Sequence, residues 1–146
     1  EPKNFVLQIL RALSAGRELR VASDLRYNPT YVENLAEVVA DLAGSGASGI
    51  FHAVGAEKIS RVDFARQAAR AFGLAESLIK PVLSAEFRSP TPRPKETSLD
   101  TRKVRAAAAT ALWGPRQGLA HMKAFEADWR AYAGLHLPLR ISPGER

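Results

Sequence analysis

The chain has 146 residues, of which 46% are apolar, which is enough for one globular domain with a buried core. It contains no cysteine, which excludes disulfides, thiolate metal ligands and cysteine nucleophiles. The net charge is +6, but the segment Lys80–Arg105 alone, with seven basic and three acidic residues, carries +4 of it. A local excess favours a short anion-binding segment, so we expect no nucleic-acid partner.

The sequence has no feature of a membrane protein. No apolar run approaches the roughly 20 residues that a bilayer requires, so we expect no membrane partner and a cytoplasmic location. The first residue is Glu1 rather than a methionine, and an amphipathic stretch begins at Phe5. We therefore expect the chain to begin inside a longer protein.

The first predicted elements are a helix over residues 4–15 and a short strand over residues 18–22. Gly16 is suited to end the helix, and residues 18–22 alternate charged and apolar side chains, as in a half-exposed strand. The apolar positions that indicate the helix recur at three- and four-residue spacing: Phe5, Val6, Ile9, Leu10 and Leu13.

A second predicted helix begins at Tyr31, after turn residues that end at Pro29. Thr30 and Glu33 have the spacing of a capping box, in which the hydroxyl accepts from the third helical amide. The helix is expected to bury one face, formed by Val32, Leu35, Ala36, Val39 and Leu42.

Residues 44–49 spell G-x-G-x-x-G, the pattern of a dinucleotide-binding turn. Such a turn needs a strand before it and a helix after it. Here a predicted helix precedes, and the apolar run over residues 50–54 predicts a strand that follows. We therefore interpret the glycines as a linker and expect no cofactor bound to this chain alone. His52, on this strand, is predicted to be a buried, hydrogen-bonded histidine.

The C-terminal half predicts three helices separated by extended segments. Ser60 caps the first, residues 78–83 are extended, and the prolines of residues 89–94 form a rigid basic loop. Residues 100–110 are helix-prone, and Gly114-Pro115 opens the last helix. Its apolar stripe is expected to be core: Leu119, Met122, Phe125, Trp129 and Tyr132. We expect one domain over residues 1–136 and a poorly ordered tail over residues 137–146.

Four motifs occur in a characteristic order: Asn4-Phe5-Val6; Asp24 to Pro29-Thr30 and Asn34-Leu35-Ala36; Gly49-Ile50-Phe51-His52; and Arg93-Pro94 followed by Ser98-Leu99-Asp100 and Lys103. Together they resemble the C-terminal part of dTDP-4-dehydrorhamnose reductases, which belong to the extended short-chain dehydrogenase/reductase superfamily. The resemblance implies an α/β fold: helices with a few short strands, lacking most of the dinucleotide-binding sheet.

The resemblance further implies an NAD(P)H-dependent reductase of a nucleotide-linked 4-keto sugar that serves polysaccharide synthesis. In that family, the cofactor loop and the Tyr-x-x-x-Lys pair lie earlier in the protein. Tyr27, Tyr31 and Tyr132 are each followed four residues later by a residue other than lysine, so we expect no catalytic residue here. The implied partners are a nucleotide-sugar substrate and a missing N-terminal dinucleotide-binding domain, which holds NADPH or NADH. An uncovered strand would also permit a homo-oligomer.

The expected substrate site combines a cation, an amide and an apolar wall. Arg93 is the candidate phosphate ligand, because its guanidinium binds phosphate oxygens in pairs and its flanking prolines restrict it; the alternative is a surface arginine. Asn4 either caps the first helix or reaches the diphosphate. Phe5 and Val21 either form the wall for a base or pack in the core.

Pro29 and Thr30 are expected to serve as turn and cap, close to the cofactor only in the intact enzyme. Tyr27 replaces a glycine of the family pattern, and Glu96-Thr97 replaces Asn-Ser beside Arg93, which leaves the substrate open. A non-catalytic binding module, like the regulatory beta subunit of methionine adenosyltransferase, is the alternative function. No metal site is expected, because the histidines lack ligand spacing.

Overall fold

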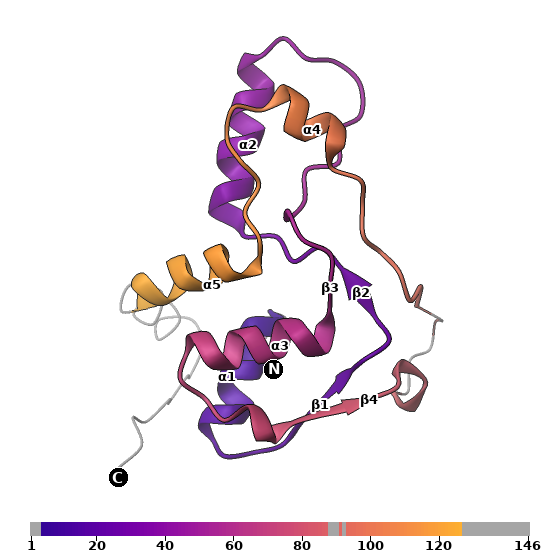
Figure 1. Ribbon diagram of the computed structural model, residues 1–146, viewed down its shortest axis with the longest axis vertical. Coiled ribbons are helices and arrows are strands. Elements are labelled where there is room, and N and C mark those ends of the chain that lie inside the picture. The colour runs from indigo at the N-terminus through magenta and orange to yellow at the C-terminus, as the bar shows by residue number, and fades with distance from the viewer. Residues whose placement is uncertain (1–3, 88–90, 92, 127–146) are drawn as a thin grey trace.

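The computed structural model describes residues 4–87, 91 and 93–126 and has an α/β fold, as the sequence predicts. The helices are α1 (Phe5–Ser14), α2 (Val32–Gly44), α3 (Arg61–Ala71), α4 (Arg102–Ala107) and α5 (Pro115–Ala124), and the strands are β1 (Leu19–Ala22), β2 (Arg26–Tyr27), β3 (Ile59–Ser60) and β4 (Ile79–Val82). Figure 1 shows α2 and α4 together at one end and α1, α3, β1 and β4 at the other. The predicted tail and the boundary at residue 136 lie outside the described residues, as do Trp129 and Tyr132.

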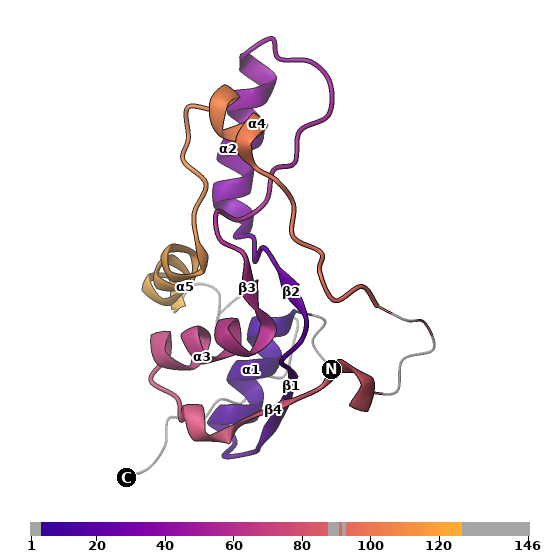
Figure 2. The ribbon, with the colours of Figure 1, turned by 45° about the vertical axis from the view of Figure 1, so that its right-hand side comes forward.

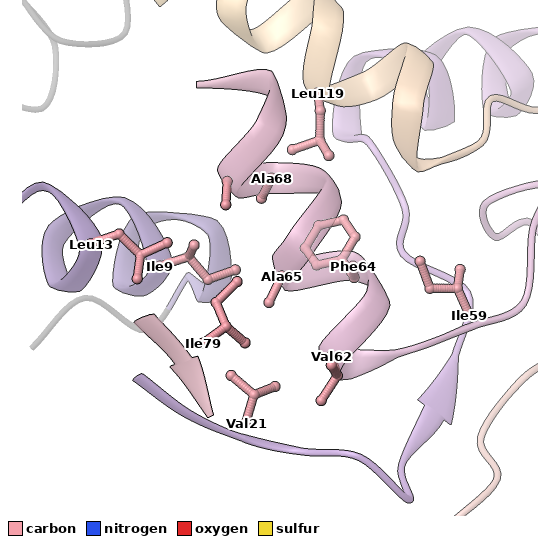
Figure 3. Close-up of a cluster of buried hydrophobic side chains, with 11 residues drawn as sticks. Ile9, Leu13, Val21, Ile59, Val62, Phe64, Ala65, Ala68, Ile79 and Leu119 are labelled. Carbon is pink, nitrogen blue, oxygen red and sulfur yellow. The ribbon is translucent and has the colours of Figure 1, made fainter. Parts of the chain in front are cut away.

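The larger core is centred on α3 (Figure 3). Ala65, Ala68 and Ala69 are fully buried, and such small side chains allow neighbouring elements to approach closely. Ile9 of α1 and Leu119 of α5 reach this core from different sides of α3. The last helix is thus partly core, as predicted, although Phe125 of its stripe is 50% exposed.

Two pairs of strands flank this core. β1 runs parallel to β4, with Val21 opposite Pro81, and β2 runs antiparallel to β3. Pro81 is tolerated because a two-stranded pair leaves an outer edge that needs no amide donor. The predicted strand over residues 18–22 and the extended segment over 78–83 are confirmed, and their pairing brings two distant parts of the chain together.

The first and third predicted helices begin as expected. The Asn4 side chain accepts from Leu7 N at 3.3 Å, and the Ser60 hydroxyl oxygen accepts from Asp63 N at 3.0 Å. The predicted capping box of the second helix is wrong. α2 begins at Val32, and the Thr30 hydroxyl accepts from Gly55 N at 3.1 Å instead, because the chain returns to this turn after α2.

The predicted buried face of α2 is only partly right, because Leu35 and Leu42 are half-buried and Leu42 packs on the smaller core, whereas Ala36 is exposed. Val32 and Val39 are 70% and 52% exposed, whereas Val38 is fully buried with Val104 of α4 and Leu112. The buried face includes Asn34, which periodicity of apolar residues alone cannot detect.

The Asn34 amide takes two backbone partners. Its Nδ2 donates to Ala111 O at 2.9 Å, and its Oδ1 accepts from Trp113 N at 2.8 Å. A buried polar side chain is stable where its hydrogen bonds are satisfied, so this asparagine joins α2 to the segment before α5.

The predicted strand over residues 50–54 does not form among the described residues. These residues follow α2 and the glycine turn but pair with no strand, and Ile50 is 80% exposed. His52 is exposed rather than buried, which corrects a second prediction. A strand needs a backbone partner, and no other described segment supplies one here.

Candidate functional site

A cavity of about 760 Å³ opens beside β1, at the start of α1 and α3. We call it the arginine cavity, because three arginines line it. Its other described lining residues come from α1, from β1 and its following turn, and from the segment after β4: Phe5, Gln8, Leu19, Val21, Ala22, Leu25, Ser84, Ala85, Phe87 and Thr91. The folded chain therefore gathers residues far apart in sequence around one concave surface.

Three of the four predicted substrate residues meet in this cavity: Arg93, Phe5 and Val21. Arg93 is exposed, and its side chain makes no hydrogen bond or ion pair with the described part of the chain. Val21 is 2% exposed and packs in the core while also lining the cavity. Val21 therefore packs in the core and also forms part of the cavity wall, so its two predicted positions do not exclude each other.

Sequence reasoning missed the other two arginines of the cavity. Arg20 donates to Glu86 Oε2 at 2.7 Å and lies over the Phe87 ring, so its charge is balanced. Arg61 lies 4.3 Å from the centroid of the Phe5 ring. The position of Arg20 on the exposed face of a predicted strand could have indicated a residue of the cavity. Nothing near Arg61 in the sequence indicates that it lies beside Phe5.

Asp24 holds the segment after β4 against the turn after β1. Its carboxylate accepts from the Ser84 backbone N–H at 2.8 Å and from the Ser84 hydroxyl at 2.9 Å, and it pairs with Lys95. The Ser84 amide, followed by the Ser84 hydroxyl and Lys95, lowers the pKa of Asp24 despite an opposing effect of burial. This contact fixes one wall of the arginine cavity and both ends of the loop that carries Arg93.

Asn4, Pro29 and Thr30 line a second cavity, of about 590 Å³, rather than the arginine cavity. The Asn4 side chain caps α1 by accepting the hydrogen bond from Leu7 N, which is one of the two roles predicted for it. The Thr30 hydroxyl also donates to Asn28 O at 3.1 Å. The structure therefore separates the predicted cofactor-proximal residues from Arg93.

The two departures from the family pattern lie outside the arginine cavity. Tyr27 is extended in β2 and packs on the core beside Phe64, and burial raises its pKa to about 12, with a smaller opposing effect of Arg61. Glu96 forms an ion pair with Lys58. Figure 2 shows this part of the chain passing β2 and β3 before it reaches α4. Beside β2, Thr97 N donates to Arg26 O.

The described residues contain no group of three or more histidine, aspartate or glutamate side chains that could hold a metal ion. Among the helices within the described ranges, none is both long enough and apolar enough to cross a bilayer.

The chain is similar in sequence to known proteins. A dTDP-4-dehydrorhamnose reductase of Mycobacterium tuberculosis is 35% identical over 86% of this chain and 42% of its own length. The spore coat polysaccharide biosynthesis protein SpsK of Bacillus subtilis is 36% identical over 71% of this chain and 36% of its own. The chain thus spans about two fifths of the length of these curated relatives.

Solved structures show the same fold. A dTDP-4-dehydrorhamnose reductase of Clostridium acetobutylicum superposes with a TM-score of 0.77 at 25% identity, over 87% of this chain and 45% of that one. The enzyme of Bacillus anthracis, solved in complex with NADP, gives 0.73 at 24% identity, over 83% and 43%. The model of the RmlD substrate binding domain matches residues 1–126. This chain therefore belongs to the RmlD substrate binding domain family, within the extended short-chain dehydrogenase/reductase superfamily.

Proposed function

We propose that the arginine cavity binds the nucleoside diphosphate of a nucleotide-linked 4-keto sugar, which the intact protein reduces with NADPH or NADH. The observation that carries the proposal is the meeting of Arg93, Phe5 and Val21 in one cavity. A guanidinium matches phosphate oxygens, and an apolar wall matches a base. No acidic residue is among the described residues of the lining, and the adjacent Glu86 is paired with Arg20.

The relatives support this function over a non-catalytic module, because their names are those of reductases or of a polysaccharide biosynthesis protein. One of the structural neighbours is a complex with NADP. In this proposal, the present chain binds the substrate and orients its sugar toward the cofactor. The chain contributes no catalytic residue.

The described residues of this chain do not fit a dinucleotide. The glycines of residues 44–49 follow α2 and precede residues that form no helix, so they provide no helix N-terminus for a pyrophosphate. The Thr30 hydroxyl already accepts a hydrogen bond from Gly55 N and donates one to Asn28 O. We propose that a separate dinucleotide-binding domain holds the cofactor and covers Val32, Val39 and Ile50, which are exposed here.

Calorimetric titration of the chain with dTDP tests the proposal. We expect weak binding that Arg93→Ala reduces by about tenfold or more, the value of one charge-assisted hydrogen bond. Arg116→Ala is the matched control, because Arg116 is exposed on α5 and lines neither cavity. Equal affinities of the wild type and Arg93→Ala would remove Arg93 from the site.

A further inference from the structure

We infer that Arg61 is the second phosphate-binding residue of the arginine cavity and makes the site selective for a diphosphate over a monophosphate. The inference rests on the proposed function and assigns a role to a residue that no sequence motif indicates. It follows from the fixed position of Arg61, from its charge and from the charge of its neighbours in the cavity.

The backbone of Arg61 is anchored on both sides. Its N–H donates to Leu25 O at 3.1 Å, and the preceding Ser60 caps α3 through the hydrogen bond to Asp63 N. Ser60 and Val62 are both buried. The first turn of α3 thus has little freedom, and the Arg61 side chain starts from a fixed point at the cavity wall.

Two aromatic rings orient the guanidinium. Its Cζ lies 4.3 Å from the centroid of Phe5 and 6.0 Å from that of Tyr27, which are distances of cation–π contacts. Phe5, on α1, stacks in turn on Phe64 of α3, with ring centroids 6.1 Å apart. Stacking uses the face of the guanidinium and leaves its N–H groups, which lie in the plane, available for an anion.

The Arg61 side chain has no counterion among the described residues, and Asp63, in the same turn of α3, pairs with Arg66. Arg20 is balanced by Glu86. Within the described ranges, the cavity therefore presents two guanidinium groups without a counterion, those of Arg61 and Arg93. A nucleoside diphosphate sugar carries one negative charge on each of its two phosphates, so the charges of site and ligand match in number.

The test compares thymidine, dTMP and dTDP as probes for the wild-type chain, Arg61→Ala and Arg61→Lys by calorimetric titration. We expect Arg61→Ala to weaken dTDP binding by about 10- to 100-fold, dTMP binding by clearly less, and thymidine binding by less than about twofold. Equal weakening of dTMP and dTDP would overturn the selectivity for a diphosphate. Arg61→Lys retains a charge without the planar donors and should lie between the wild type and Arg61→Ala for dTDP. Arg66→Ala is the control, because Arg66 lies on the same helix but lines neither cavity.

Equal weakening of thymidine and dTDP would overturn the inference, because it would give Arg61 only a packing role. Unchanged dTDP affinity in Arg61→Ala, together with the expected loss in Arg93→Ala, would overturn this inference and leave the proposed function intact. No dTDP binding by the wild type would overturn both. Thermal unfolding identifies a variant that fails to fold; in that case, wild-type dTDP affinity in Arg61→Lys would overturn the inference.

Discussion

Several residues of this chain make tertiary contacts that the neighbouring sequence does not predict. Gly55 is one example, because it is the point at which the chain returns to the turn before α2. Its N–H donates to the Thr30 hydroxyl, and its carbonyl accepts from Asn28 Nδ2 at 3.0 Å. A Cβ at this position would lie 1.8 Å from Pro29 O, so glycine is required here by close approach.

Gly55→Ala should destabilise the chain by about 1–3 kcal/mol, because the backbone of Pro29 must shift to admit the methyl group. Urea denaturation followed by circular dichroism measures the free energy of unfolding. Gly44→Ala is the matched control, since a Cβ at Gly44 meets nothing within 4 Å and α2 tolerates alanine at its last residue. Equal stability of the two variants would contradict the close contact.

Glu96 predicts a pH dependence of stability. The hydrogen bond that its carboxylate accepts from Lys58, followed by those from Ser98, lowers its pKa from 4.5 to about 2. A carboxyl group with a lowered pKa in the folded state stabilises that state fully above 4.5, and this contribution is lost as the pH falls from 4.5 to about 2. Glu96→Gln should therefore flatten the fall in thermal stability across this range. An unchanged slope in a melting series from pH 6 to pH 2 would contradict the prediction.

At the scale of elements, α2 is the clearest case in which tertiary contacts override an apolar pattern. The helix itself forms where the sequence predicts it, but its buried face contains Asn34 and Val38 instead of Val32 and Val39. Side chains spaced by three and four residues identify a helix, yet several overlapping faces satisfy that spacing. The partner of the helix decides which face is buried.

Asn34→Ala should cost about 1–3 kcal/mol of stability, because it leaves the Ala111 carbonyl and the Trp113 amide without their partner. Glu37→Ala, one turn further on an exposed position of α2, should change stability by less than about 0.5 kcal/mol. Urea denaturation of both variants measures the difference. A loss in the control as large as in Asn34→Ala would show that the cost does not come from the two hydrogen bonds of Asn34.

At the scale of the whole molecule, the structure is asymmetric. The end formed by α1, α3, β1 and β4 has a core of many side chains, whereas the end with α2 and α4 has a small core around Val38, Val104 and Leu112 (Figure 1). Exposed apolar residues on α2 and at Ile50 lie near this smaller core in sequence. We expect this end to associate with another surface, either the proposed cofactor domain or a second copy of the chain.

Adjacent valines on α2 provide a test of that surface. Val39→Lys should leave stability within about 0.5 kcal/mol of the wild type and should reduce self-association, because Val39 is 52% exposed. Val38→Ala, which removes two buried methyl groups, should cost at least about 1 kcal/mol. Sedimentation velocity and urea denaturation measure the two effects. Unchanged self-association in Val39→Lys would exclude this face as the contact.

The sequence by itself determined the α/β class, the family, the start of α1 and α3, and the extended segments that became β1 and β4. These depend on local caps, spacing and motif order, which a linear pattern records. The resemblance to a known family named Phe5, Val21, Arg93 and Asn4 as substrate residues, and the structure places the first three in one cavity and Asn4 in another. Their role in binding stays a prediction.

Only the tertiary structure decided the partner of Thr30, the buried face of α2, the absence of pairing over residues 50–54 and the place of Arg61 in the cavity. Each of these depends on which segment returns to which surface. Such contacts join residues that are far apart in the chain, so the local sequence contains no signal for them.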